Sequence, residues 1–538
     1  MAGYGDESFG RRTARVLSAV LIGRIASIAI TGITIVLIAR LLGPANYGIY
    51  IFAFGFASLI DAVGGLGIGT YLGRTLAIHG FKKDHRGMMR SLSSGYFLLL
   101  SFALLLTLLA LGLSGYLSGT LYAGLGIPVI TLMTASLMIF FIMVRSVSIH
   151  ALIGLSKGFY SSLCSVAGNT IQLVLGVLLI IYGFGVEGAL VGMLAGYAVS
   201  AALGTFLIFY SLREYGRTDL SMPRLRDLRE TAKFSFPIGA NTMLNDGMQN
   251  FSVLFLGFYV SKAVLGDYGA ALKGFATIIL LYGSINSVLI PAFSRARLIK
   301  RKSELRRTYD KVLGYSLVAI LPVFVYVMVF SQPAVYLFLS RSYSSAPGYL
   351  SLIVLGAAIN AISLFIGSII ISGSRTIKML KYNAVAVLVQ LALLLALAPT
   401  FLVYGSIVAI FIVGNVVSLA LFLRGARKLF GVRFDSGRIL RIFASNILLG
   451  MVLVAVLYTV AYAAGGSASN LALLAELLAG LAAAALVYPA LFMLTRAVKR
   501  EDLESIRSSV ERLPVLRVPV YWIVGYSSLF LGRNIEGK

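Results

Sequence analysis

The sequence has little charge, a single cysteine and few histidines. Only 12% of its 538 residues are charged and 59% are hydrophobic, whereas soluble domains are about 25% charged. The one cysteine, Cys164, excludes an intrachain disulfide and a cysteine-based zinc cluster. The histidines, His79, His85 and His150, lack the spacing of metal ligands. The composition therefore excludes a water-soluble globule and predicts a polytopic membrane protein without a metal site.

Apolar runs long enough to cross about 30 Å of hydrocarbon as helices follow one another along the chain. We predict fourteen transmembrane helices in an all-α fold, at residues 16–38, 47–72, 92–114, 128–150, 160–183, 186–211, 236–260, 266–290, 312–338, 346–372, 382–403, 404–423, 442–465 and 471–495. A glycine run, "GGLGIG" at 64–69, falls inside the second of them, where close helix packing explains it.

Lysine and arginine are distributed unevenly between the predicted loops. Of the 46 such residues, all but six lie in the tails or in loops that follow even-numbered helices. Because cytoplasmic loops are enriched in Lys and Arg, we expect a multi-pass protein of the cytoplasmic membrane with both termini in the cytoplasm. The net charge of +26 then faces anionic lipid heads. Membrane lipids, not nucleic acid, are the expected partners of these charges.

An internal repeat relates the first six predicted helices to the next six. "ANYGIYIFAFGFASLI" (45–60) resembles "GDYGAALKGFATII" (266–279), an offset of about 220 residues. Since each copy holds an even number of helices, both have the same orientation, as in transporters whose substrate site lies between two halves. We predict an N-lobe at 1–215, a C-lobe at 216–425, two extra helices at 426–495 and a cytoplasmic or interfacial tail at 496–538.

Several stretches resemble a known family. They are "ARLLGPANYGIY" (39–50), the fifth and sixth helices (154–197), "FSFPIGANTML" (234–244) and "VLIPAFSR" (288–295). They resemble the polysaccharide transporter (Wzx-type) oligosaccharide flippases of the multidrug/oligosaccharidyl-lipid/polysaccharide exporter superfamily. The resemblance implies two six-helix lobes around a central cavity. It also implies that a lipid-linked oligosaccharide, a glycan on polyprenyl pyrophosphate, is flipped by alternating access. Glycan-assembly enzymes are further expected partners.

Three cations inside predicted helices are candidate substrate contacts. Arg24 lies near mid-membrane, where an arginine costs roughly 2.5–3.5 kcal/mol. A guanidinium fork suits phosphate oxygens, so we predict that Arg24 and Arg145 attract the pyrophosphate. The resemblance adds Lys273, which falls near a cavity arginine of the related lipid II flippases. The alternatives are ion pairs, Arg24–Asp61 or Asp246–Lys273, and snorkelling of Arg145 to the membrane surface.

Acidic and amide side chains complete the candidate site. Asp61 and Asp246 are candidate sites for coupling to H+ or Na+, and no other cofactor is expected. Asn241, Asn245 and Gln249 share one face of a predicted helix at a spacing of four residues. We predict that this face lines a hydrated cavity and contacts sugar hydroxyls, with interhelical hydrogen bonding as the alternative.

Two functions remain open from the sequence. The first is the lipid-linked oligosaccharide flippase, and the alternative is an ion-coupled multidrug-type exporter of the same superfamily. The exporter needs an acidic or aromatic cavity for cationic compounds, which a central arginine disfavours. A glycan polymerase or ligase needs catalytic residues in large outer loops, and the predicted outer loops are short. We therefore expect a transporter and not an enzyme.

Overall fold

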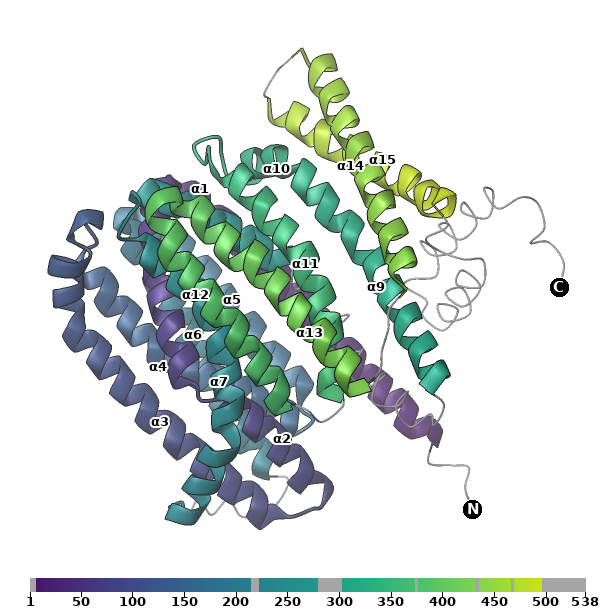
Figure 1. Ribbon diagram of the computed structural model, residues 1–538. Helices are drawn as coiled ribbons and strands as arrows, with labels where there is room; N and C mark the ends of the chain where they lie inside the picture. The colour runs from purple at the N-terminus through teal and green to yellow at the C-terminus, as the bar shows by residue number, and fades with distance from the viewer. Residues whose placement is uncertain are drawn as a thin grey trace. The chain divides into compact units, whose positions relative to one another are not determined.

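The computed structural model describes residues 6–213, 222–278, 302–372, 376–430, 435–465 and 469–495. Every regular element in these ranges is a helix (Figure 1). Nine of the described helical stretches are long and apolar enough to span a membrane, which confirms an all-α, multi-pass membrane protein. Three of the nine have 42, 55 and 51 residues, enough for two crossings each. The count of fourteen stays a prediction, because part of 266–290 lies outside the described residues.

The chain divides into two compact units. The first unit comprises Met1–Lys273 and Asn383–Ser406. Its complete helices are α1 (Asp6–Gly64), α2 (Ile68–Phe81), α3 (His85–Tyr116), η1 (Leu117–Leu121), η2 (Ala123–Leu125), α4 (Val129–Gly154), α5 (Gly158–Leu179), η3 (Ile180–Phe184), α6 (Gly185–Leu212) and α7 (Leu225–Leu256). It also includes the helix at 262–278 as far as Lys273 and most of α12 (Thr376–Ile407).

The second unit comprises Gly274–Tyr382 and Ile407–Lys538. Its helices in the described part are α9 (Lys302–Val329), α10 (Ser331–Phe338), α11 (Ala346–Ser372), η5 (Val408–Val413), α13 (Gly414–Phe430), α14 (Ser436–Ala463) and α15 (Asn470–Leu494). The predicted lobe boundaries follow the internal repeat and stay a prediction, and the predicted tail at 496–538 lies outside the described residues.

Backbone breaks occur where the sequence predicts one helix to end and the next to begin. Within α1, Gly43 has φ 68° directly before Pro44, between the predicted helices 16–38 and 47–72. Gly183, with φ 95°, separates α5 from α6. Within α12, Leu402 has φ 51°, next to the predicted boundary between residues 403 and 404. These three predicted boundaries therefore coincide with breaks in the backbone.

The glycine run at 64–69 is a correction to the sequence analysis. It does not lie inside a continuous helix, because α1 ends at Gly64 and α2 begins at Ile68. Leu66 and Gly67 between them have φ 45° and 68°, a left-handed conformation that glycine adopts most readily. The predicted close packing is present, since a Cβ on Gly67 would lie 2.6 Å from the backbone nitrogen of Gly239 in α7.

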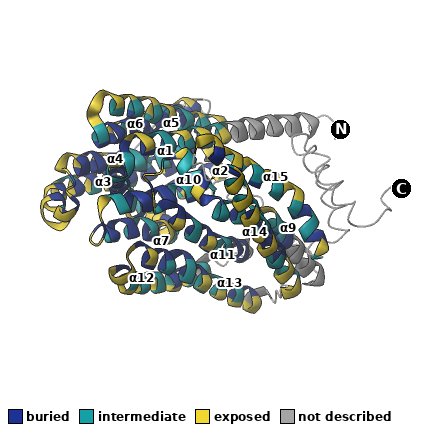
Figure 2. Ribbon diagram, turned by 90° about the horizontal axis from the view of Figure 1, so that it is seen from above, coloured by how far each residue is buried: buried dark blue, intermediate teal, exposed yellow. Residues whose placement is uncertain are grey.

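Burial follows helix packing, and the outer helix faces stay apolar. Figure 2 shows buried and exposed residues on opposite sides of the same helices. In α4, Leu132, Ala135 and Met138 are fully buried, whereas Leu104 and Leu108 of α3 are 53% and 58% exposed. Large exposed apolar surfaces are rare on soluble monomers. Lipid contact accounts for them in a membrane-spanning protein.

Candidate substrate cavity

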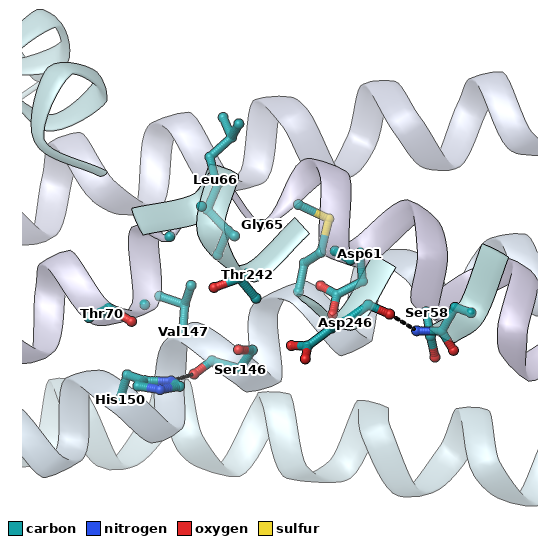
Figure 3. Close-up of a pocket in the computed structure, with 17 residues that line it drawn as sticks. Ser58, Asp61, Gly65, Leu66, Thr70, Ser146, Val147, His150, Thr242 and Asp246 are labelled. Carbon is teal, nitrogen blue, oxygen red and sulfur yellow. Dashed lines mark hydrogen bonds between the residues drawn. The ribbon is translucent and has the colours of Figure 1, made fainter. Parts of the chain in front are cut away.

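A polar cavity of about 460 Å³ lies within the first unit (Figure 3). This volume falls in the range of about 300–1,000 Å³ typical of small-molecule sites. Five helices (α1, α2, α3, α4 and α7) and the glycine turn line it, and they contribute Ser58, Asp61, Ala62, Gly65, Leu66, Gly67, Gly69, Thr70, Leu99, Met143, Ser146, Val147, His150, Gly239, Thr242, Asp246 and Asn250. Segments up to about 190 residues apart in the sequence therefore build one site.

Two carboxylates meet in this cavity. Asp61 lies on α1 and Asp246 on α7, and both line the cavity (Figure 3). Their charges interact electrostatically. In the part of the chain that the structure describes, neither forms a salt bridge. The two residues predicted to couple transport to an ion are therefore brought together, while coupling itself stays a prediction.

One face of α7 supplies the second wall of the cavity. Thr242, Asp246 and Asn250 follow one another at a spacing of four residues and all line it. The Thr242 hydroxyl donates to the Ile238 backbone oxygen (3.3 Å), and Asn250 Nδ2 donates to the Asp246 backbone oxygen (3.0 Å). Both side chains are thus held along the helix axis. Thr242 was not predicted as a site residue from the sequence, although its spacing of four residues from Asp246 indicates the same helix face.

The predicted amide face of α7 is displaced by one residue from the cavity-lining face. Successive residues of an α-helix are rotated by about 100°, so Asn241, Asn245 and Gln249 are absent from the cavity lining. Asn241 Oδ1 accepts a hydrogen bond from Asn383 Nδ2 of α12 (2.8 Å). Asn245 Nδ2 donates to the Asn241 backbone oxygen (2.7 Å). The interhelical alternative therefore describes Asn241, and sugar contact by the three amides stays a prediction.

Helix α4 contributes an imidazole that the sequence analysis passed over. His150 Nδ1 donates to the Ser146 backbone oxygen at 2.8 Å, and both residues line the cavity. The sequence analysis considered the histidines only as metal ligands. Its one available signal was that His150 and Ser146 share a face of the predicted helix 128–150 at a spacing of four residues.

Arg145 lies beside the cavity rather than in its wall. The side chain is half-buried, and its Cζ lies 5.3 Å from the ring centroid of Tyr197 on α6, within the range of a cation–π contact. Arg145 also interacts electrostatically with Asp61. The guanidinium is therefore held against the Tyr197 ring, and its contact with pyrophosphate stays a prediction.

Arg24 and Lys273 also lie outside the cavity lining. The Arg24 side chain is exposed, and the described residues include no salt bridge between Arg24 and Asp61. Lys273 Nζ lies 3.4 Å from the ring centroid of Phe54 on α1. The described part likewise contains no Asp246–Lys273 pair. Neither proposed ion pair is thus found among the described residues, and substrate contact by either cation stays a prediction.

The lining chemistry is acidic and rich in hydroxyl groups. It comprises two carboxylates, one imidazole, the hydroxyls of Ser58, Thr70, Ser146 and Thr242, and the amide of Asn250, and the described residues contribute no lysine or arginine to it. Such groups can accept and donate hydrogen bonds to sugar hydroxyls, or hold a proton or a cation. The predicted pyrophosphate contacts lie outside this cavity.

Comparison with known protein families identifies the lineage of the chain. Residues 37–348 match the model of a family described as "Polysaccharide biosynthesis protein", a match over more than half of the sequence. The chain belongs to this family. Membership in the polysaccharide biosynthesis family confirms the resemblance seen in the sequence motifs. No curated protein matches the chain.

Solved structures share the fold of this polysaccharide biosynthesis protein. A structure of the lipid II flippase MurJ in an inward closed conformation covers 89% of this chain and 98% of its own, with 17% identity and a TM-score of 0.70. An inward-facing multidrug resistance MATE family transporter of the MOP superfamily covers 76% and 97%, with 18% identity and a TM-score of 0.58. A MOP superfamily transporter from Pyrococcus furiosus covers 77% and 95%, with 20% identity and a TM-score of 0.53. At these identities, the likeness shows that the chain shares the fold of these structures.

Proposed function

We propose that the protein is a flippase that moves a lipid-linked oligosaccharide, a glycan on polyprenyl pyrophosphate, across the cytoplasmic membrane. The observation that carries this proposal is the match of residues 37–348 to the polysaccharide biosynthesis family. The cavity supports it, because carboxylates, hydroxyls and an amide suit sugar hydroxyls. The concentration of Lys and Arg in the tails and in alternate loops supports an orientation with both termini in the cytoplasm.

In this proposal the substrate head group is divided between two environments. The sugar contacts Asp61, Asp246 and the hydroxyls of the cavity. The pyrophosphate contacts cations outside the cavity lining, of which Arg145 lies on α4, a helix that also lines the cavity. Arg24 and Lys273 are the further anion contacts, and Asn241, Asn245 and Gln249 contact the glycan. Asp61 and Asp246 couple the cycle to H+ or Na+.

A second candidate function is favoured by one observation. The described lining of the cavity has two carboxylates and no lysine or arginine, a polarity that attracts cationic small molecules. The fold also resembles a multidrug resistance MATE family transporter. This pair of observations supports an ion-coupled exporter of cationic compounds as the alternative.

Reconstituted protein in proteoliposomes separates the two functions. We expect the protein to move a lipid-linked oligosaccharide to the opposite leaflet, read by its accessibility to a glycan-modifying enzyme added outside. Asp61→Asn and Asp246→Asn reduce this rate, whereas Asp84→Asn, a matched loss of charge outside the cavity lining, retains it. Accumulation of a cationic dye with no movement of the glycan lipid would establish the exporter instead.

A further inference from the structure

The α1 segment after Gly43 crosses the helix at 262–278, and at Gly48 and Gly266 the two backbones touch directly. A Cβ added to Gly48 would overlap the backbone oxygen of Lys262, and one added to Gly266 would overlap the backbone oxygen of Pro44. The two stretches are the two copies of the internal repeat, and Tyr47 and Tyr268 beside them are fully buried. The repeated motif therefore forms a crossing with no room for a side chain.

A second crossing of the same kind joins the turn before α2 to α7. A Cβ on Gly239 would overlap the backbone carbon of Leu66, and one on Gly67 would lie 2.6 Å from the Gly239 backbone nitrogen. Next to it, the buried hydroxyl of Thr231 lies 2.9 Å from Ser94 Oγ and donates to Tyr71 Oη at 3.2 Å. Helices α2, α3 and α7 are thus fastened at this end by backbone packing and hydroxyl contacts.

The polar cavity lies between the two crossings. Gly48 and Gly64, where α1 ends just before the turn, are separated by roughly 24 Å at 1.5 Å per helical residue, most of the 30 Å of bilayer hydrocarbon. Asp61 and the other α1 residues of the cavity wall fall between them in the sequence. Between the cavity and Gly48, the Phe52 ring of α1 packs against Gly257, since a Cβ added to Gly257 would lie 2.9 Å from that ring. The cavity is therefore bounded by packed helices in both directions.

We propose that the two glycine crossings are the two gates of the transport cycle. The Gly48–Gly266 crossing closes the cavity toward the outside, and the Gly67–Gly239 crossing closes it toward the cytoplasm. This assignment of sides rests on the orientation in the proposed function. Backbone contacts suit a gate, because helices that touch through glycines can separate without pulling apart interlocked side chains.

Each crossing makes a directional prediction. A methyl group at Gly48 clashes only while the outer gate is closed, so Gly48→Ala favours the state that is open to the outside. By the same reasoning Gly239→Ala favours the state that is open to the cytoplasm. We expect shifts of about tenfold in the gate equilibrium, equivalent to about 1.4 kcal/mol and within the range of overpacking costs. Gly32→Ala on α1 is the matched control, since nothing lies within 4 Å of its added Cβ.

Cysteine labelling measures the two gates separately. The single native cysteine is buried, so Cys164→Ser gives a clean background for Ser58→Cys in the cavity wall. A membrane-impermeant thiol reagent is applied to the outside of cells or to inverted vesicles. We expect Gly48→Ala to raise labelling from outside, Gly239→Ala to raise labelling from the cytoplasmic side, and Gly32→Ala to change neither. Thr242→Cys on the opposite wall repeats the measurement.

The outcomes separate the gates from misfolding and from the proposed function. Loosening of the whole fold raises labelling from both sides in one variant, and that result overturns the gates. Unchanged labelling in both glycine variants overturns them as well. A shift with the two sides exchanged supports the gates and refutes the proposed orientation. Labelling needs no substrate. If the variants show the expected shifts but the protein moves no glycan lipid, the gates are supported and only the proposed function is refuted.

Discussion

Replacing Thr231 tests most directly whether its hydroxyl contacts keep α2, α3 and α7 packed together in the closed state. Thr231 is fully buried and contacts Ser94 and Tyr71 through one oxygen, at 2.9 and 3.2 Å. Thr231→Val keeps the shape and removes both hydrogen bonds. Interhelical hydrogen bonds in membrane proteins average about 0.6 kcal/mol each, so the loss is about 1.2 kcal/mol. That shifts the closed–open equilibrium by roughly sevenfold.

The assay is the labelling of Ser58→Cys from the cytoplasmic side, with Thr242→Val as control. Thr242 lies on the same helix, but its hydroxyl bonds only to the carbonyl of Ile238 in that helix. We expect Thr231→Val to raise the labelling rate severalfold and Thr242→Val to leave it unchanged. Equal rates in the two variants would refute the view that these hydroxyls hold the end closed. Tyr71→Phe, which keeps its ring beside Phe234 at 5.7 Å, should give about half the free-energy effect.

Two further predictions concern stability in detergent. Asn415 is buried in the second unit, where it accepts a hydrogen bond from Asn360 Nδ2 (2.9 Å) and donates one to the Gly356 backbone oxygen (3.0 Å). Asn415→Ala should therefore lower the free energy of unfolding by about 1–3 kcal/mol. An unchanged melting temperature would contradict this. Asp84 caps α3, and the Gly87 N–H, followed by the His79 side chain, lowers the pKa of its carboxyl. Its contribution is present above the unfolded pKa of about 3.9 and is lost as the pH falls through the lowered folded pKa. Asp84→Asn keeps an oxygen that can cap the helix but removes the charge. We therefore expect the variant to be less stable than wild type at neutral pH and equally stable at acid pH. A stability difference that does not change with pH would show that the charge does not contribute.

Helix boundaries were predictable because they depend on local residues, whereas the orientation of α7 was not. Gly43–Pro44 interrupts an apolar run, and the resulting break could be predicted at that position. On α7, the faces at 241/245/249 and 242/246/250 both place polar residues at a spacing of four. Periodicity cannot choose between them, because the choice depends on which face packs against other helices. Asn383 contacts the first of these faces from about 140 residues away in the sequence.

The glycine turn at 64–69 likewise depends on a tertiary contact that sequence periodicity does not reveal. The run at 64–69 is compatible with a packed helix or with a break, and the sequence analysis chose the helix. The close approach of the Gly239 backbone comes from a segment about 170 residues later in the chain. The cations show it too, since the predicted depth of Arg145 said nothing of the Tyr197 ring that holds it. Depth in the membrane follows from sequence, but partners follow from tertiary packing.

The carboxylate pair connects the cavity with the gate beside it. Asp61 precedes the Gly67 turn on α1, and Asp246 follows Gly239 on α7, so parting the crossing draws the two carboxylates away from each other. Their mutual repulsion opposes closure unless a proton, a cation or the hydroxyls of a sugar lie between them. On the proposed function and gates, we therefore expect ligand binding in the cavity and closure of the Gly67–Gly239 crossing to be energetically linked. Asp61→Asn removes the repulsion, so we expect it to lower cytoplasmic labelling of Ser58→Cys in the absence of substrate, opposite to Gly239→Ala. Higher labelling in Asp61→Asn would show that the pair holds the crossing closed by a bridging ion, and would reverse the sign of the linkage.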